Sequence, residues 1–355
     1  MRRPLLSILA AASALLVTAA PTLACGGLIG PNGAVNLLRT TTFAGYTDGV
    51  EHYVTSFEFA GGGGSFGSIT PLPGIPTDVV RGGDWTLQRL IRETDPVEDL
   101  AFRALAAGES AAADEAEVLL ETTIDALDIT ILRGGGDEVG LWARNHGFRL
   151  PPDSPEVLNF YADRSPIFMA AAFDADAAAA RGQALGDGTP VHLTIPTDNP
   201  WVPLRILGLG KAPGELVEAD VYLLTDIKPA LMPNAGAFAE SDGLILDHSE
   251  AASESLLEDL RSDVGMEWVP DEAWLTKVVV SSEARELDFD LAIDASGAGR
   301  PSAIDAGYAP FGSSRAPGAP VALYLLLGAM MVIALPLLFD RSVRGASRTP
   351  PFAGA

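Results

Sequence analysis

The sequence predicts an α+β fold, in which a mainly antiparallel β domain with several short helices is followed by one C-terminal transmembrane helix. Three observations predict it. Strand-like runs follow one another with only occasional helical segments between them, which is typical of antiparallel pairing. The dipeptide Asp48-Gly49 separates two such runs and favours a tight hairpin turn. Residues 319–339 carry no charged side chain, as expected of a bilayer-spanning segment.

Composition limits the partners of the chain. Its 355 residues include 47 acidic and 23 basic side chains, which gives a formal charge of −24. Such a charge repels nucleic-acid phosphate and anionic lipid headgroups. We therefore expect no nucleic-acid partner, and no membrane binding through a broad basic patch. The hydrophobic fraction of 48% is enough for one or two folded domains.

Residues 1–24 have the three regions of a secretory signal peptide. Two arginines precede an apolar stretch that is too short for an ordinary spanning helix, and small residues follow it. Thr22 and Ala24 fit the −3 and −1 positions of a cleavage site. The sequence therefore predicts export, with Cys25 as the first residue of the mature protein.

Cys25 is the only cysteine, so the chain cannot form an internal disulfide. The residues Thr22 to Cys25 also resemble a lipobox, in which the cysteine becomes lipidated after cleavage. The match departs from that pattern at Thr22, where such boxes favour leucine. Two interpretations stay open: possible lipidation of Cys25, or a free or intermolecularly paired thiol near the terminus.

The run 319–339 is predicted to cross a lipid bilayer. Its 21 residues extend over about 31 Å at about 1.5 Å per residue, which matches the hydrocarbon thickness of a membrane. A buried core helix, the alternative, would normally end before this length. Three arginines and one aspartate follow in the tail 340–355, so the positive-inside rule predicts a short basic cytoplasmic tail. The acidic domain would then lie outside the cell membrane, in a single-pass protein.

Residues 25–294 are predicted to form this extracytoplasmic α+β domain, with two halves that could meet near 133–137. The segment 295–318 is dense in Gly, Pro, Ser and Ala. Such a composition cannot bury enough apolar surface to fold by itself, so we expect a stalk between domain and membrane.

The domain begins with an expected β-hairpin over 37–61. Along its second arm Tyr53 and Thr55 alternate with residues such as His52, so we expect one core face and one solvent face. The proline-rich passage 65–80 is expected to be extended and irregular rather than a central strand.

Helices are expected to begin at Asp95 and at Ser110, the second running towards Thr122. Two further short helices are expected where Asp137 and Ser154 can act at the N-terminus. The other expected elements are a helix near 253–264 and strands over 126–136, 166–173, 191–197, 202–210, 218–226, 274–282 and 286–294.

The order of these segments resembles the bacterial domain-of-unknown-function family numbered 2330. The similarity covers most of 25–293 and includes an exported Cys-Gly start and a strand pair. Three short motifs carry it as well: Pro71-Leu72-Pro73, Gly147-Phe148-Arg149 and Pro203-Leu204-Arg205. The resemblance implies an uncharacterised exported or membrane-anchored bacterial protein. The family offers no activity or catalytic residue to carry over.

The sequence contains no strong catalytic or cofactor motif. Its four histidines have no partner at zinc-site spacing, and the pattern GxSxG is absent. Gly62, Gly64 and Gly67 satisfy GxGxxG, but a proline-rich segment follows them where a dinucleotide site needs a helix. We therefore expect no catalytic residue, no cofactor and no firmly bound metal.

Asp288, Asp290 and Asp294 are the one weak metal candidate. In the expected strand they alternate with apolar residues, and carboxylates on one side can bind calcium outside cells. The same spacing equally describes the ordinary solvated face of a strand.

Two functions remain open. The expected stalk, the single span and the missing motifs favour a binding or structural module of the bacterial cell envelope. The alternative is an envelope enzyme of the hydrolase type whose active site no motif marks. A deep pocket lined by histidines or carboxylates would favour the enzyme.

Anchoring by the span can be tested against anchoring by Cys25. We expect Cys25→Ser to leave the protein in the membrane fraction, because a 21-residue span already inserts almost irreversibly. Truncation before Ala319 should release the protein. If the truncated protein stays membrane-bound and becomes soluble only when Cys25 is also replaced, a lipid on Cys25 is the anchor.

Overall fold

The computed structural model describes residues 22–23, 27–30, 33–34, 39–58, 66–95, 116–182, 188–236, 243–297 and 301–308. These residues belong to one compact unit that ends at Tyr308. Cys25, the expected span 319–339 and the tail 340–355 lie outside the described residues, so their roles stay predictions. No helix in the described part of the chain is long and apolar enough to cross a membrane.

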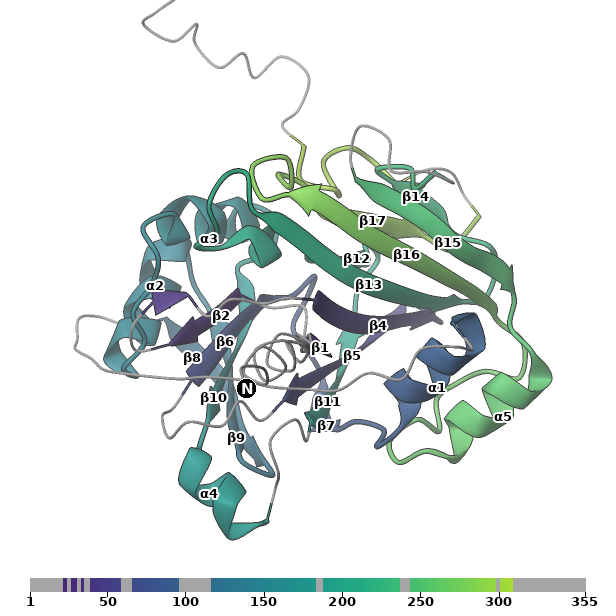
Figure 1. Ribbon diagram of the computed structural model, residues 1–355, viewed down its shortest axis with the longest axis horizontal. Helices are drawn as coiled ribbons and strands as arrows, with labels where there is room; N and C mark the ends of the chain where they lie inside the picture. The colour runs from purple at the N-terminus through teal and green to yellow at the C-terminus, as the bar shows by residue number, and fades with distance from the viewer. Residues whose placement is uncertain are drawn as a thin grey trace, which may run out of the picture. The chain divides into compact units, whose positions relative to one another are not determined.

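An eight-stranded sheet is the largest layer of the fold (Figure 1). Its strands follow the order β15-β16-β13-β4-β5-β11-β7, and β1 also pairs with β4. All of its pairs are antiparallel except β4 with β1 and β4 with β13. The bounds are β1 Thr22–Leu23, β4 Arg39–Thr47, β5 Val50–Glu58, β7 Asp78–Arg81, β11 Gly188–Pro196, β13 Leu216–Thr225, β15 Leu244–Ala251 and β16 Trp274–Glu283.

Two smaller sheets are antiparallel throughout. One has six strands in the order β3-β2-β6-β10-β9-β8, and the other has three in the order β12-β17-β14. The bounds are β2 Gly27–Gly30, β3 Gly33–Ala34, β6 Phe66–Pro71, β8 Glu117–Ile124, β9 Leu127–Arg133, β10 Ile167–Phe173, β12 Trp201–Val202, β14 Ala230–Met232 and β17 Leu291–Asp294. The predicted α+β class with mainly antiparallel pairing is thus confirmed.

Helices cover the sheets in two groups. Their bounds are α1 Thr86–Thr94, α2 Gly136–Asn145, α3 Ser154–Ala162, α4 Ala175–Ala180 and α5 Glu254–Ser262, with a short 3₁₀ helix η1 at Arg205–Gly208. α1 and α5 lie side by side on the eight-stranded sheet (Figure 1), where Leu90 and Leu257 share an apolar core with Phe43. α2 and α3 join the larger core that also includes the six-stranded sheet. Burial of these apolar faces is the main term that stabilises such a layered fold.

The expected hairpin is confirmed, but its solvent face is not. Asp48 and Gly49 form the turn between β4 and β5, with φ of 53° and 78°. Both values are positive, as a tight primed turn requires. β5 lies inside the sheet between β4 and β11, so Tyr53 on one face and Val54 on the other are both buried. The expected division into core and solvent faces was therefore wrong.

Two other sequence predictions are corrected by strand pairing. The helix expected from Ser110 to Thr122 gives way to β8 from Glu117, where β-branched residues pair with β9. β6 is a central strand of its sheet despite its proline, because Pro71 is its last residue. Asp95 follows the last residue of α1, and the helix expected after it lies outside the described residues, so it stays a prediction.

The expected strand over 202–210 is also corrected. Only Trp201–Val202 are extended there, and η1 follows at Arg205–Gly208. The expected strand over 286–294 is likewise shorter, since β17 covers Leu291–Asp294.

Part of the expected stalk belongs to the folded unit as well. Ala306 is fully buried, and its carbonyl accepts a hydrogen bond of 2.9 Å from the main chain of Asp290.

A buried carboxylate, Asp290, joins four parts of the fold. It is 0% exposed and forms an ion pair with Arg164, which follows α3. The Tyr161 hydroxyl of α3 donates to Asp290 Oδ1 over 2.8 Å. The main-chain N–H groups of Leu204 and Arg205, at the start of η1, donate to the same oxygen over 2.7 and 3.1 Å. Asp290 was expected on a solvated strand face, and that expectation was wrong.

Removing the Asp290 carboxylate should destabilise the fold strongly. Asp290→Ala leaves the Arg164 guanidinium and two main-chain donors without their acceptor, which typically costs about 3 to 5 kcal/mol. Urea unfolding of the full chain in detergent, followed by tryptophan fluorescence, measures this change.

Asp288→Ala is the matched control, because Asp288 is exposed only two residues away. Its effect should stay within about 0.5 kcal/mol. Equal stability of the two variants would show that the buried network contributes nothing.

Candidate ligand-binding pocket between two helices

α2 and α3 lie against each other and form the walls of a pocket. α2 begins after the extended residue Gly135, and no side chain caps it, although Asp137 was expected to do so. Instead the Gly136 N–H donates to the Asn159 side chain of α3 over 3.0 Å. α3 begins at Ser154, and Pro155 lies in its first turn, where a proline is favourable. Both predicted helices are confirmed.

The Gly147-Phe148-Arg149 motif ends α2. Gly147 has a φ of 86°, in the left-handed region that glycine adopts without strain. The N–H of Gly147 bonds to the Arg144 carbonyl over 3.1 Å, and that of Phe148 to the Ala143 carbonyl over 2.9 Å. This is the Schellman arrangement of a helix C-terminus. It turns the chain so that Phe148 is buried and Arg149 remains exposed.

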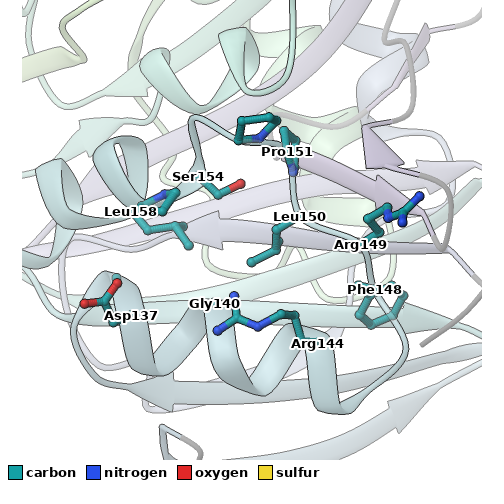
Figure 2. Close-up of a pocket in the computed structure, with 12 residues that line it drawn as sticks. Asp137, Gly140, Arg144, Phe148, Arg149, Leu150, Pro151, Ser154 and Leu158 are labelled. Carbon is teal, nitrogen blue, oxygen red and sulfur yellow. The ribbon is translucent and has the colours of Figure 1, made fainter. Parts of the chain in front are cut away.

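The α2–α3 pocket has a volume of about 360 Å³ and lies between these two helices and the segment that joins them (Figure 2). Phe148, Leu150, Pro151 and Leu158 give it an apolar wall. This volume falls within the range of small-molecule sites, which are mostly apolar with a few placed polar groups.

The charged groups that line the pocket are not paired with one another or with other side chains that the structure describes. Arg144 and Arg149 are exposed and form no ion pair with any residue that the structure describes. Seven other arginines in the described ranges do form ion pairs with carboxylates, namely Arg81, Arg89, Arg133, Arg164, Arg205, Arg261 and Arg285. Asp137 also lines the pocket without such a pair. The pocket therefore offers two cations and one anion to a ligand.

Ser154 adds a buried hydroxyl. Its side chain is 1% exposed, and its Oγ has no hydrogen-bond partner among the described residues. Figure 2 shows Ser154 at the start of α3, on the side of the helix that faces the segment of Leu150 and Pro151. A buried hydroxyl without a partner costs about 1 to 3 kcal/mol. This oxygen is inaccessible to a water-sized molecule, so it is part of the wall behind the pocket surface.

A second pocket, the Tyr46 pocket, lies near the end of the described chain. It has a volume of about 310 Å³ and is lined by Tyr46 together with Asp198, Asp294 and Asp305. Desolvation and the nearby carboxylates raise the pKa of Tyr46. Asp294 accepts hydrogen bonds from Ser296, and Asp305 accepts them from Ser302, so two of the three carboxylates already have local partners.

Two histidines that are far apart in the sequence meet on the eight-stranded sheet. Nδ1 of His52 and Nε2 of His192 lie 3.0 Å apart, and Trp268 stacks on His52 with ring centres 3.9 Å apart. Burial lowers the pKa of His52 to about 3 and that of His192 to about 4. Both rings are therefore neutral at pH 7. No group of three or more metal-binding side chains forms within the described ranges.

The structure does not gather the three weak calcium candidates into a site. Asp290 is buried with Arg164, Asp288 is exposed, and Asp294 is half-buried beside Ser296. Sequence reasoning pointed to the Gly147-Phe148-Arg149 motif but missed Arg144 as a ligand partner. The sequence did contain one signal for this site: Asp137, Gly140 and Arg144 are spaced so that they lie on one face of α2.

Glu51 provides a test of how burial changes the pKa of a side chain in this fold. It is fully buried in β5, and burial raises the pKa of its carboxyl to about 8, against a smaller opposing effect of the Trp201 main chain. The unfolded carboxyl ionises near 4.5, so stability is lost as the pH rises from about 4.5 to about 8. Glu51→Gln should therefore stabilise the fold by about 3 kcal/mol at pH 7, and by less than about 0.5 kcal/mol at pH 4.5.

Urea unfolding at both pH values measures this difference. Glu250→Gln, on an exposed position of β15, is the control and should show no such dependence. An equal effect of Glu51→Gln at both pH values would contradict the neutral buried carboxyl.

Comparison with known proteins identifies a family but no activity. No curated protein matches the sequence. A crystal structure of a mutated baculovirus P35 after caspase cleavage matches with 10% identity and a TM-score of 0.40, over 74% of this chain and 98% of that one. The caspase-8/P35 complex matches with 9% identity and a TM-score of 0.33, over 72% and 90%. Likeness at these TM-scores gives no basis for transferring a function.

The family model described as an uncharacterized protein conserved in bacteria (DUF2330) matches residues 19–290. All three motifs that suggested the resemblance have a structural role. Leu72 is fully buried and its N–H bonds to the Ile167 carbonyl over 3.0 Å, while the other two motifs form the α2 turn and the Asp290 contacts. The chain belongs to the DUF2330 family of uncharacterized bacterial proteins.

Proposed function

We propose that this chain is a single-pass, membrane-anchored binding module of the bacterial cell envelope, and that its folded domain binds a small carboxylic acid in the α2–α3 pocket. The apolar run 319–339 and the signal-like residues 1–24 support the location. One observation carries the binding role: in a chain of 47 acidic residues, two arginines without ion pairs line a pocket that also has an apolar wall.

The chemistry of this pocket suits a carboxylate. A guanidinium presents a planar set of donors that matches a carboxylate and remains charged at every physiological pH. Charge-assisted hydrogen bonds of this kind are about twice as strong as neutral ones. The apolar wall formed by Phe148, Leu150 and Leu158 would cover the rest of the ligand. The acid would therefore combine a carboxylate with an apolar body.

The alternative, an envelope hydrolase, rests on the Tyr46 pocket, which is the carboxylate-lined pocket that would favour an enzyme. General acid and base groups must be free to exchange protons with a substrate. Asp294 and Asp305 instead bind the neighbouring serines Ser296 and Ser302. The α2–α3 pocket has more unpaired polar groups and is the stronger basis for a function.

Acid binding can be tested with 4-methylpentanoate and its neutral amide as probes. Isothermal titration calorimetry on the full chain in detergent should detect the acid and not the amide, because only the acid can pair with Arg144. Arg144→Gln should weaken binding of the acid at least tenfold, in line with the loss of about 1.5 to 3 kcal/mol for a charged hydrogen bond.

Arg92→Gln is the matched control, since Arg92 is an exposed arginine in the last turn of another helix, α1. Its binding should equal that of the unmodified chain. Equal binding of acid and amide, or an unchanged affinity in Arg144→Gln, would contradict the proposed function.

A further inference from the structure

The α2–α3 pocket carries an anionic group as well as its two cations. Asp137 lies at the second position of α2 and Arg144 in its last turn. These positions are seven residues apart, which is close to two helical turns, so both side chains lie on the same face of α2. Gly140 lies between them and also lines the pocket.

The Arg144 guanidinium lies over Gly140. A methyl group on Gly140 would be 3.5 Å from Nη1 of Arg144 and 3.2 Å from Cδ1 of Leu150. Figure 2 shows the Arg144 side chain extended along the helix at this point, on the side where Asp137 lies. The guanidinium is therefore near the level of residue 140, about 4.5 Å along the helix axis from residue 137 at 1.5 Å per residue.

The two charged groups line one pocket without pairing, so a ligand between them can act as a bridge. Asp137 and Arg144 form no ion pair with each other, although both line one pocket. A simple acid would satisfy Arg144 and leave Asp137 unpaired next to a second carboxylate. A ligand with an ammonium and a carboxylate on adjacent atoms would satisfy both groups.

We propose that the α2–α3 pocket binds a zwitterionic α-amino acid with an apolar side chain. Its carboxylate pairs with Arg144, its ammonium pairs with Asp137, and its side chain packs on Leu150 and Leu158. This inference rests on the proposed function and adds the amine to it.

Both charges also have a structural effect, which the test must separate. Asp137 near the N-terminus of α2 and Arg144 near its C-terminus favour the helix dipole by about 0.3 to 1 kcal/mol each. That effect changes the stability of the chain and does not depend on a ligand. The informative quantity is therefore a ratio of two ligand affinities within one variant.

The experiment compares leucine with 4-methylpentanoate, which is leucine without its amine. Calorimetry on the full chain in detergent should show leucine binding about 10 to 100 times more tightly, as expected for one charge-assisted pair. In Asp137→Asn this ratio should fall to about one, while 4-methylpentanoate keeps or gains affinity. Glu138→Gln removes the same charge at the next residue, outside the pocket lining, and should keep the ratio.

The results separate the amino-acid proposal from the proposed binding of a simple acid. If both acids bind equally to the unmodified chain, or if Asp137→Asn keeps the ratio, the zwitterion is wrong and acid binding stands. If neither acid binds, the proposed function fails as well. Thermal melting of each variant, measured without ligand, confirms that the comparison is made on folded protein.

Gly140 supplies an independent variant. Gly140→Leu keeps every charge but fills the space beside Leu150 and the Arg144 guanidinium. It should abolish leucine binding, whereas Gly140→Ala, which adds one methyl group to the same helix position, should retain more of it. Leucine binding that survives Gly140→Leu unchanged would place the ligand elsewhere and overturn the proposal.

Discussion

The position of α3 depends on the buried carboxylate of Asp290. One charge at 0% exposure is acceptable only if its oxygens are fully bonded, and here Arg164, Tyr161 and the start of η1 supply the donors. Two of these donors belong to α3 or to the turn after it. Any movement of α3 would therefore break the bonds of a buried ion.

The helix α3 connects the Asp290 contacts to the α2–α3 pocket. Ser154 and Leu158, which line the pocket, are on the same helix as Tyr161. Asn159 of that helix also bonds to the start of α2 over 3.0 Å, which links the second wall to the first. A pocket whose walls are held in this way can present its polar groups without reorganisation, which favours binding.

The fold class and the local turns could be predicted because they depend on neighbouring residues. Asp48 and Gly49 set the hairpin, and Gly147 ends α2 through its positive φ. Burial on both faces of β5 could not be predicted, because it depends on β11, which is distant in the sequence. The start of α1 could not be predicted either, because it depends on a residue that is distant in the sequence. Asp263 accepts hydrogen bonds there from the main chain of Asp84 and Trp85.

The site was harder to predict than the fold for a related reason. A strand pattern cannot distinguish Asp288, which is exposed, from Asp290, which is buried, because the difference is made by Arg164 in the turn after α3. Likewise, the spacing of Asp137 and Arg144 shows that they share a helix face, but only the contact with α3 shows that this face lines a pocket.

A crystal structure of the chain grown with leucine tests the central claim most directly. The account predicts density between α2 and α3, with the carboxylate of the ligand at Arg144 and its ammonium at Asp137. An α2–α3 pocket without ligand, together with leucine bound in the Tyr46 pocket, would contradict it.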